Sequence, residues 1–255
     1  MSNATVITVM IRKGGSAKTT TAINLAKGLA KQGKRVLLID ADSQGNVGMA
    51  LGIAEDEQNL AGVLGGKVKL TEAIKETAGL YLLMSGSNLS EYEARLTAQV
   101  NLYAFKMLFD TLRPMYDFIV IDTPPSDGVI TRNALVASDY ALIPAQAQTL
   151  AVKGIGQAIG LVQTMTQVNP SLKLLGVLPT MVQANTNVGN TFLTYMKNFY
   201  ADYLLPYPIP LTIKASESQL AGIPLVDYAE SSSASQAYTD LAKYVITKIE
   251  RAEEQ

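Results

Sequence analysis

The sequence predicts an α/β protein in which helices cover both faces of a mostly parallel sheet. Short apolar runs alternate along the chain with segments whose apolar residues recur at helical spacing. Unbroken runs of Val, Ile and Leu are typical of strands buried on both faces, as in parallel sheets. No stretch rich in Pro, Gly or Ser divides the 255 residues. We therefore expect one domain over residues 1–255.

The first forty residues justify this prediction. Residues 5–11 (TVITVMI) form a β-branched run that leads into glycines. Residues 19–31 carry apolar side chains on one helical face, and Gly33 stands where helices commonly end. Residues 35–40 (RVLLID) are again a buried strand. This order predicts a right-handed crossover between two parallel strands.

The same alternation continues to the end of the chain. Further strands are expected at 80–84, 117–122, 140–144 and 174–178. Further helices are expected at 99–112, 154–167, 190–203 and 234–251. Serines just before the last segment, at 231–233, are typical of a helix N-terminus.

The composition excludes several classes of chemistry. The chain has no Cys and no His, which excludes thiol nucleophiles, disulfides, iron–sulfur ligation, the usual zinc sites and Ser-His-Asp catalysis. Lys plus Arg number 21 and Asp plus Glu 22, so any DNA-binding surface has to be local. No apolar run approaches the ~20 residues of a membrane span. We expect a cytoplasmic protein without a membrane partner.

Residues 13–20 (KGGSAKTT) lie between the first strand and the first helix and predict a phosphate site. Small residues allow backbone N–H groups to surround an anion, and the helix adds its positive end. Lys18 is expected on the β- and γ-phosphates, Thr19 on Mg²⁺ and Thr20 on the α-phosphate. The loop itself consists of Gly14, Gly15, Ser16 and Ala17. A flexible glycine loop with solvated lysines is the plainer alternative, which the strand and helix on either side disfavour.

The loop departs from the strict P-loop pattern, because Arg12 and Ala17 stand where its two glycines belong. It matches the deviant form K-G-G-x-x-K-[ST] instead, and here the sequence resembles the ParA/MinD superfamily of deviant Walker ATPases, specifically ParA-like partition proteins. Residues 36–46 (VLLIDADSQGN) resemble the family's second motif, with Ser43 in place of Pro, and 118–125 (FIVIDTPP) its Walker B strand. Later segments match in order at 142–146, 180–187 and 209–228, whereas 51–110 match least.

The resemblance implies a P-loop NTPase fold of three layers and an Mg²⁺-dependent ATP hydrolase. It implies that Lys13 reaches the phosphates of a partner's ATP and that Asp42 orients the attacking water. Asp40 would support the metal site and Asp122 would hold Mg²⁺ through water. Thr180, Met181 and residues around Pro210 would border the adenine. Each carboxylate also has a plainer interpretation as the cap of a loop at a strand end.

Two departures affect these expectations. Ala17 adds a Cβ where the backbone approaches phosphate, so we expect slower hydrolysis or a reshaped loop. Lys153 stands where relatives often carry Glu; it is either a second cation near the dimer interface or, as we favour, an ordinary exposed lysine.

The resemblance further implies an ATP-bound homodimer that binds DNA non-specifically. Candidate DNA-binding residues are Lys173, Lys197, Lys214, Lys243, Lys248 and Arg251. Each alone is more simply a solvated cation, but a dimer doubles the patch. Against strong binding, Asn185 and Leu211 stand where relatives often have Arg. The acidic end of the chain, 246–255, is unlike a membrane-binding helix, and nothing before Thr5 resembles a helix-turn-helix that would bind a specific DNA site.

The primary hypothesis is therefore an ATPase on nucleoid DNA that positions or segregates a cargo, with a cargo-bound adaptor that stimulates hydrolysis. The cargo could be a plasmid, a chromosome or a protein body such as a carboxysome. The alternative is a metabolic or assembly ATPase that uses the same loop on a small substrate or client protein without DNA.

Overall fold

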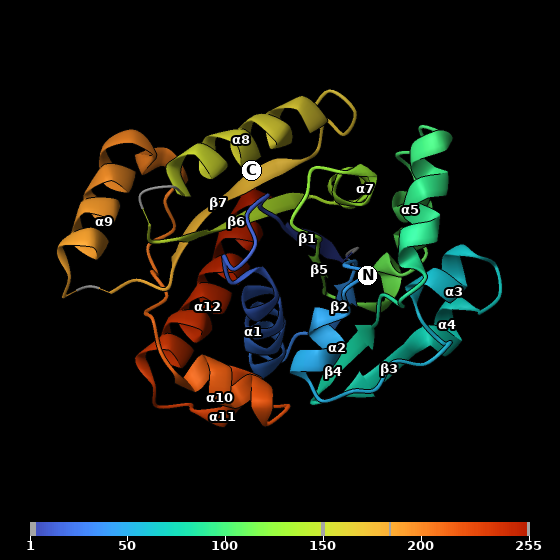
Figure 1. The fold of residues 1–255 in the computed structure, drawn as a ribbon, viewed down its shortest axis with the longest axis horizontal. Coiled ribbons are helices and arrows are strands. Elements are labelled where there is room, and N and C mark those ends of the chain that lie inside the picture. Colours follow the sequence, from blue (N-terminus) through green and yellow to red (C-terminus); the bar gives the residue numbers. More distant parts are fainter. Residues whose placement is uncertain (1–3, 149–150, 184, 254–255) are drawn as a thin grey trace.

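A seven-stranded sheet runs through the molecule (Figure 1), in a computed structural model that describes residues 4–148, 151–183 and 185–253. The strand order is β3-β4-β2-β5-β1-β6-β7. Every neighbouring pair is parallel except β3 and β4. The strands are β1 Thr5–Val9, β2 Val36–Asp40, β3 Ile74–Thr77, β4 Leu80–Leu83, β5 Phe118–Asp122, β6 Tyr140–Gln146 and β7 Lys173–Thr180. The predicted mostly parallel sheet is confirmed.

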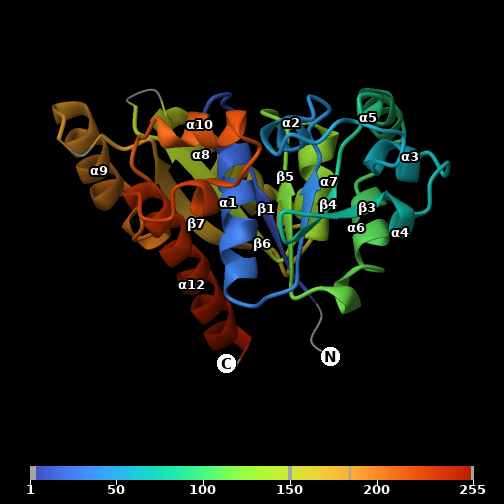
Figure 2. The same ribbon diagram turned by 90° about the horizontal axis from the view of Figure 1, so that it is seen from below.

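Helices cover both faces of this sheet, as Figures 1 and 2 show. One face packs against α1, α11 and α12, and the other against α5, α6, α7 and α8. The longer helices are α1 Lys18–Lys31, α5 Leu89–Ala98, α7 Val129–Ala137, α8 Ala151–Met165, α9 Asn187–Phe199 and α12 Ser233–Glu253. The shorter ones are α2 Asn46–Ala50, α3 Leu60–Leu64, α4 Leu70–Ala73, α6 Ala104–Phe109, α10 Lys214–Leu220 and α11 Leu225–Tyr228, with 3₁₀ turns at Arg113–Met115 and Ala201–Tyr203. The predicted α/β class is therefore confirmed.

Helix α1, which begins at the phosphate loop, is fixed by close packing on α12. A Cβ on Gly28 would lie 2.9 Å from Cβ of Ala242, so the missing side chain allows the two helices to approach. The buried hydroxyls of Thr21 and Tyr238 share a hydrogen bond of 3.1 Å between the same helices. The first helix of the site is thereby held in place along its length.

The prediction of one helix over 99–112 is wrong at its N-terminal part. Helix α5 ends at Ala98, and Val100 adopts a left-handed backbone conformation with φ 52° that a helix cannot continue through. Oδ1 of Asn101 then accepts a hydrogen bond from the N–H of Tyr103 at 2.9 Å, a turn that competes with helix formation. Only Ala104–Phe109 of the predicted segment forms a helix, α6.

Two other boundaries differ from expectation. The helix predicted over 190–203 ends at Phe199, because Tyr200 leaves helical geometry before a 3₁₀ turn. Strand β3 was not predicted, since its sequence, IKET, is mostly polar and its residues are at most half-buried. The N-cap prediction before α12 is confirmed by the N–H of Ser235, which donates to Oγ of Ser232.

Among the residues that the structure describes, no helix is both long and apolar enough to cross a bilayer.

Candidate nucleotide-binding site

The predicted phosphate loop lies at the carboxyl end of β1 and leads directly into α1. Gly15 and Ala17 both have left-handed backbone conformations, with φ 69° and 64°. The side of the loop toward the protein is held by hydrogen bonds: Oγ of Ser16 donates to the carbonyl of Lys13, and Oγ1 of Thr180 donates to the carbonyl of Ser16. Its other side faces a cavity of about 760 Å³.

The cavity brings together residues from five parts of the chain, one of which is Met181, directly after β7. Its other walls are the loop and the start of α1, the segment after β2, the segment after β5, and α10. The lining residues are Gly14, Gly15, Ser16, Ala17, Lys18, Thr19, Thr20, Asp42, Asn46, Met49, Ala50, Pro125, Met181, Ser216, Gln219 and Leu220. The carboxyl ends of β1 and its neighbour β5 meet here, the position at which open α/β sheets bind ligands.

Asp122 is fully buried and lies outside the described lining of the cavity, but it contacts Thr19, which is part of that lining. Oδ2 of Asp122 accepts a hydrogen bond from Oγ1 of Thr19 at 2.7 Å. Its other oxygen, Oδ1, is buried and has no partner within the described residues. Burial raises the pKa of Asp122 to about 8, and the nearby Asp40 carboxyl acts in the same direction. A buried carboxylate oxygen without a partner, next to a threonine hydroxyl that still has lone pairs to offer, is a place for a cation or a water.

Lys18 points its charge into the same region. The residue is buried, and its Nζ lies 3.5 Å from the carbonyl of Lys13. Burial lowers its pKa, while the carboxylates of Asp122 and Asp42 oppose that shift. Within the described parts of the chain Lys18 forms no close ion pair, and a buried ammonium group of this kind is suited to bind an anion in the cavity.

Asp40 supports the loop after β2 from below. It is fully buried, lies in register with Asp122 on the next strand, and accepts hydrogen bonds from the N–H groups of Asp42 and Val47, both at 3.0 Å. Burial raises the pKa of Asp40 to about 7. Both of its oxygens are thus used to hold the loop that carries Asp42.

Asp42 faces the cavity directly. Its Oδ1 accepts a hydrogen bond from the N–H of Gln44 at 3.1 Å, and its Oδ2 accepts one from Nδ2 of Asn46 at 3.4 Å. The carboxylate is therefore oriented from within its own loop. Its position on the wall allows contact with a water or a phosphate in the cavity.

Two groups of predicted residues lie differently from the rest. Lys13 is absent from the described lining of the cavity, and its exposed Nζ donates to Oε1 of Gln148 at 3.0 Å instead. Of the three residues expected near the adenine, Met181 lines the cavity, whereas Thr180 is fully buried beneath the loop. Pro210 lies beside Val182 and outside the described lining.

Sequence reasoning missed the part of the wall that α10 provides. Ser216, Gln219 and Leu220 face the cavity, and Nε2 of Gln219 donates a hydrogen bond to Oγ1 of Thr20 at 3.1 Å. These residues lie in the segment 209–228, which resembles the family in sequence, but the sequence analysis assigned no role to Ser216, Gln219 or Leu220. Their spacing of three and four on one helix was the available signal.

The predicted DNA-binding cations differ in their surroundings, because some of them have partners within the chain and others are exposed. Nζ of Lys248 donates to the carbonyl of Leu175 and lies over the ring of Tyr244, while Lys214 and Lys243 form ion pairs on their own helices. Lys173, Lys197 and Arg251 are exposed. Lys153 is exposed as well, as expected for an ordinary surface lysine.

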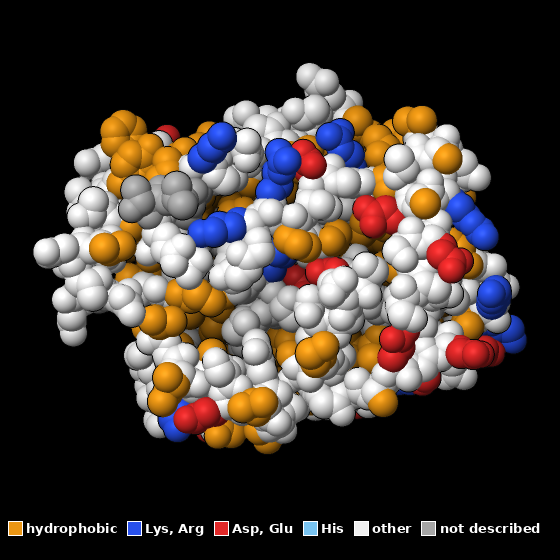
Figure 3. All heavy atoms as spheres, in the orientation of Figure 1, with side chains coloured by type: hydrophobic (Ala, Val, Ile, Leu, Met, Phe, Trp, Pro, Cys, Tyr) orange, Lys and Arg blue, Asp and Glu red, His pale blue; other side chains and the backbone are white. Residues whose placement is uncertain are grey.

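Charge is unevenly distributed on the face onto which Figures 1 and 3 look. Basic side chains gather in Figure 3 over α8 and the loop above α1, whereas acidic and basic side chains are intermixed over α3, α4 and α5. The near-zero net charge is therefore compatible with a local cluster of basic side chains on this face.

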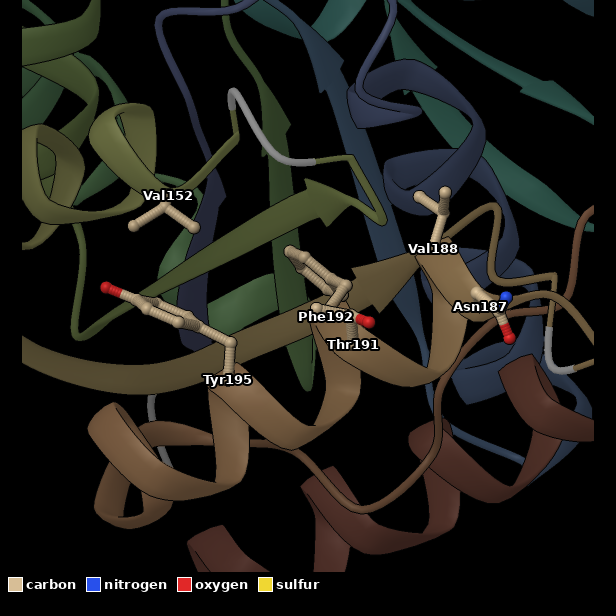
Figure 4. A pocket seen from close by; sticks show the side chains of 6 residues that line it. All are labelled: Val152, Asn187, Val188, Thr191, Phe192 and Tyr195. Carbon is tan, nitrogen blue, oxygen red and sulfur yellow. The ribbon is translucent and has the colours of Figure 1, made fainter.

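A second cavity, of about 450 Å³, lies between the start of α8 and α9. Figure 4 shows Val152 of α8 opposite Phe192 and Tyr195 of α9. Its lining is mostly apolar and includes Asn187, Val188 and Thr191 from the same helix. Val188 and Phe199 of α9 are large apolar side chains that are more than half exposed. None of the residues that line this cavity lines the cavity at the phosphate loop.

Comparisons with known proteins give a consistent result. The family model described as AAA domain matches residues 4–174. The sporulation initiation inhibitor protein Soj of Bacillus subtilis is 36% identical over 246 residues, which cover 94% of this chain and 97% of Soj. The chromosome partitioning protein ParA of Myxococcus xanthus is 34% identical over 253 residues, which cover 95% of this chain and 88% of that protein.

A solved structure agrees over the same length. The crystal structure of cobyrinic acid a,c-diamide synthase from Mycobacterium smegmatis with bound ATP analog and magnesium superimposes with a TM-score of 0.83 at 34% identity. The match covers 95% of this chain and 94% of that one.

Proposed function

The chain belongs to the ParA/MinD-type ATPases, and on this basis we propose that it is an ATP-dependent dimerising ATPase that binds DNA and positions or segregates a cargo. The observation that carries the proposal is the similarity to Soj and ParA over nearly the whole chain, together with a cavity that collects the expected phosphate-binding residues. Chromosome partitioning is what the name of the Myxococcus xanthus ParA states of that protein, whereas Soj of Bacillus subtilis is named as an inhibitor of sporulation initiation.

The residues of the cavity fit ATP and Mg²⁺. The unpartnered Oδ1 of buried Asp122 and the hydroxyl of Thr19 are oxygen ligands of the kind that Mg²⁺ prefers, either directly or through water. Lys18 and the loop amides provide positive charge for the β- and γ-phosphates. Bound Mg²⁺ would neutralise phosphate charge as it develops during phosphoryl transfer. Asp42 would orient the attacking water, and Asp40 would hold Asp42 in place.

Lys13 supports the dimer in this proposal. Lys13 lies outside the described lining of its own cavity, and its exposed Nζ donates a hydrogen bond to the side chain of Gln148. A lysine in that position is free to reach the phosphates bound by a second copy of the chain, where it would stabilise transition-state charge as an arginine finger does. Hydrolysis would then depend on dimerisation.

DNA and the adaptor would bind outside the nucleotide cavity. The exposed cations Lys173, Lys197 and Arg251, doubled in a dimer, would contact DNA phosphates without reading sequence. The apolar cavity between α8 and α9 offers a place for apolar side chains of a cargo-bound adaptor. Such a dimer would associate with the nucleoid while nucleotide is bound.

A second candidate function remains, because of one observation. The match to cobyrinic acid a,c-diamide synthase covers 95% of this chain, about as much as the match to Soj, which covers 94%. The synthase is named for a metabolic reaction. A metabolic or assembly ATPase would use the same cavity for ATP and would not require DNA.

Binding of the purified chain to a fluorescent, non-specific DNA duplex distinguishes the two functions. The proposal predicts binding with ATP and Mg²⁺, none with ADP, and a steep loss of affinity as salt rises. Lys13→Ala is the matched variant. It should still bind ATP, but it should bind DNA more weakly, because Lys13 supports the dimer in this proposal. Absence of ATP-dependent DNA binding at low salt would refute the partition function and leave the metabolic one.

A further inference from the structure

Gln219 connects α10 to the helix that follows the phosphate loop. Its Nε2 donates a hydrogen bond to Oγ1 of Thr20 at 3.1 Å, across 199 residues of sequence. Ser216, Gln219 and Leu220 lie on one face of α10 and line the cavity together with the loop. Helix α10 is therefore a wall of the cavity that touches the phosphate-binding residues themselves.

The direction of this hydrogen bond determines what the hydroxyl of Thr20 can do next. A threonine hydroxyl has one hydrogen to donate and two lone pairs that accept. Because Gln219 donates to it, the hydroxyl accepts there and keeps its own hydrogen free. The backbone carbonyl of Thr20 is occupied separately, since Nδ2 of Asn24 donates to it at 2.8 Å. The hydroxyl hydrogen of Thr20 can therefore be donated to an acceptor inside the cavity.

The segment that carries Gln219 is anchored to α1 at further points. The N–H of Val226 donates to Oδ1 of Asn24 at 3.0 Å, and Lys27 and Lys31 form ion pairs with Asp227. At the end of α10, a Cβ on Gly222 would lie 3.2 Å from the carbonyl of Leu51, so the backbone abuts the end of α2. The backbone that carries Gln219 is therefore fixed relative to α1 and α2.

We propose that Gln219 is a positioning residue for nucleotide binding, which turns the hydroxyl of Thr20 toward the α-phosphate. The proposal rests on the ATP site of the proposed function and adds a contribution from α10 to it. Gln219 acts through Thr20. Its effect is therefore the same for every nucleotide that carries an α-phosphate.

The expected effects separate Gln219 from a merely structural residue. Replacing it by Ala, or by Met, which keeps the length of the side chain without its donor, weakens binding of Mg-ATP and Mg-ADP alike by about fivefold, the effect of one lost hydrogen bond. Replacing Thr20 by Val keeps its shape and removes the hydroxyl. In that background, replacing Gln219 by Ala causes no further loss.

Calorimetric titration of the full chain with Mg-ATP and Mg-ADP provides the test. Five proteins are compared: the unaltered chain, Gln219→Ala, Gln219→Met, Thr20→Val and the double variant Thr20→Val/Gln219→Ala. Gln236→Ala, which removes another exposed glutamine from a helix, is the matched control. The thermal midpoint of each shows that it is folded. A second readout uses the two diastereomers of ATP with sulfur at the α-phosphate, which the unaltered chain distinguishes and the Gln219 variants distinguish less.

The outcomes are separable. Affinities of Gln219→Ala and Gln219→Met equal to that of the unaltered chain would overturn the positioning role, and so would losses that simply add in the double variant. If the unaltered chain itself bound neither nucleotide, the ATP site of the proposed function would be refuted instead.

Discussion

Oγ1 of Thr19 donates a hydrogen bond to Oδ2 of Asp122 at 2.7 Å, while Oδ1 of that buried carboxyl has no partner in the described parts of the chain. The contact joins the first turn of α1 to the end of β5, on the two sides of the phosphate loop. A buried oxygen without a hydrogen-bond partner lowers the free energy of unfolding. Proteins commonly retain such an oxygen only where a ligand completes the site. This relationship makes stability and ligand binding depend on the same carboxyl.

The stability of the chain without ligand should fall as pH rises from about 4 to about 8. Burial raises the pKa values of Asp122 and Asp40 above 3.8, so the folded chain binds protons that the unfolded chain has released. Asp122→Asn cannot lose a proton, and we expect it to increase the free energy of unfolding at about pH 8 by on the order of 1–3 kcal/mol. Urea denaturation at about pH 5 and at about pH 8 measures the change.

At about pH 5 both proteins should be of similar stability, because Asp122 is then protonated in the folded chain. The opposite result would be an unaltered chain that is more stable at about pH 8 than at about pH 5 and an Asp122→Asn variant with the same pH dependence of the free energy of unfolding. That result would show that ionisation of the buried Asp122 carboxyl does not destabilise the folded chain.

Asp42→Ala should bind ATP and remain a dimer. Asp40 holds the loop that carries Asp42 through two backbone N–H groups, so we expect the loop to keep its position although the contacts of the Asp42 carboxylate with Gln44 and Asn46 are lost. Without a residue to orient the water, ATP persists and the dimer accumulates. Size-exclusion chromatography with light scattering measures the mass, with ADP as the control. A monomer in the presence of ATP would count against the assigned role.

Ala17→Gly should speed hydrolysis of ATP several-fold and stabilise the chain by about 0.5–1 kcal/mol. Ala17 has φ 64°, a left-handed conformation that costs a non-glycine residue about 1 kcal/mol. Its Cβ also stands where the backbone approaches phosphate. Ala78→Gly is the control, since Ala78 has φ 50° and lies outside the described lining of the cavity. Equal hydrolysis rates in both variants would show that Ala17 does not limit the reaction.

Packing of α1 on α12 should tolerate no added atom at Gly28. A Cβ there would lie 2.9 Å from Cβ of Ala242, so Gly28→Ala should lower the free energy of unfolding by about 1–3 kcal/mol. Gly160→Ala on α8 meets nothing within 4 Å and should raise it by about 0.4–1 kcal/mol. Thermal unfolding compares the two. A Gly28→Ala variant as stable as Gly160→Ala would mean that the helices separate without cost.

The sheet was predictable from sequence because its parallel strands are buried on both faces and therefore apolar throughout. Residues 117–122 and 35–40 differ from the observed strands by one residue at one end. Strand β3 was not predictable in this way, because an edge strand paired on one side can be polar. The break after Ala98 depends on a left-handed Val100, a residue type that carries no such signal.

The candidate site could be proposed from sequence where one segment, or the ends of neighbouring strands, provide its residues. The loop, Lys18 and Thr19 are contiguous, Asp42 follows β2, and Asp122 is the last residue of β5, the neighbour of β2 in the sheet. The α10 wall could not be proposed in this way, because Gln219 reaches Thr20 only through tertiary structure. Lys248 was likewise judged a free surface cation, whereas packing brings its Nζ to the carbonyl of Leu175.

Calorimetric titration of Lys18→Ala with Mg-ATP tests the central claim most directly, since Lys18 is the buried cation of the proposed phosphate site. The unaltered chain and Lys67→Ala, which removes an exposed lysine, should bind Mg-ATP with similar affinity. Lys18→Ala should show no heat of binding although it remains folded. Retained affinity in Lys18→Ala would contradict the assignment of this cavity as the ATP site.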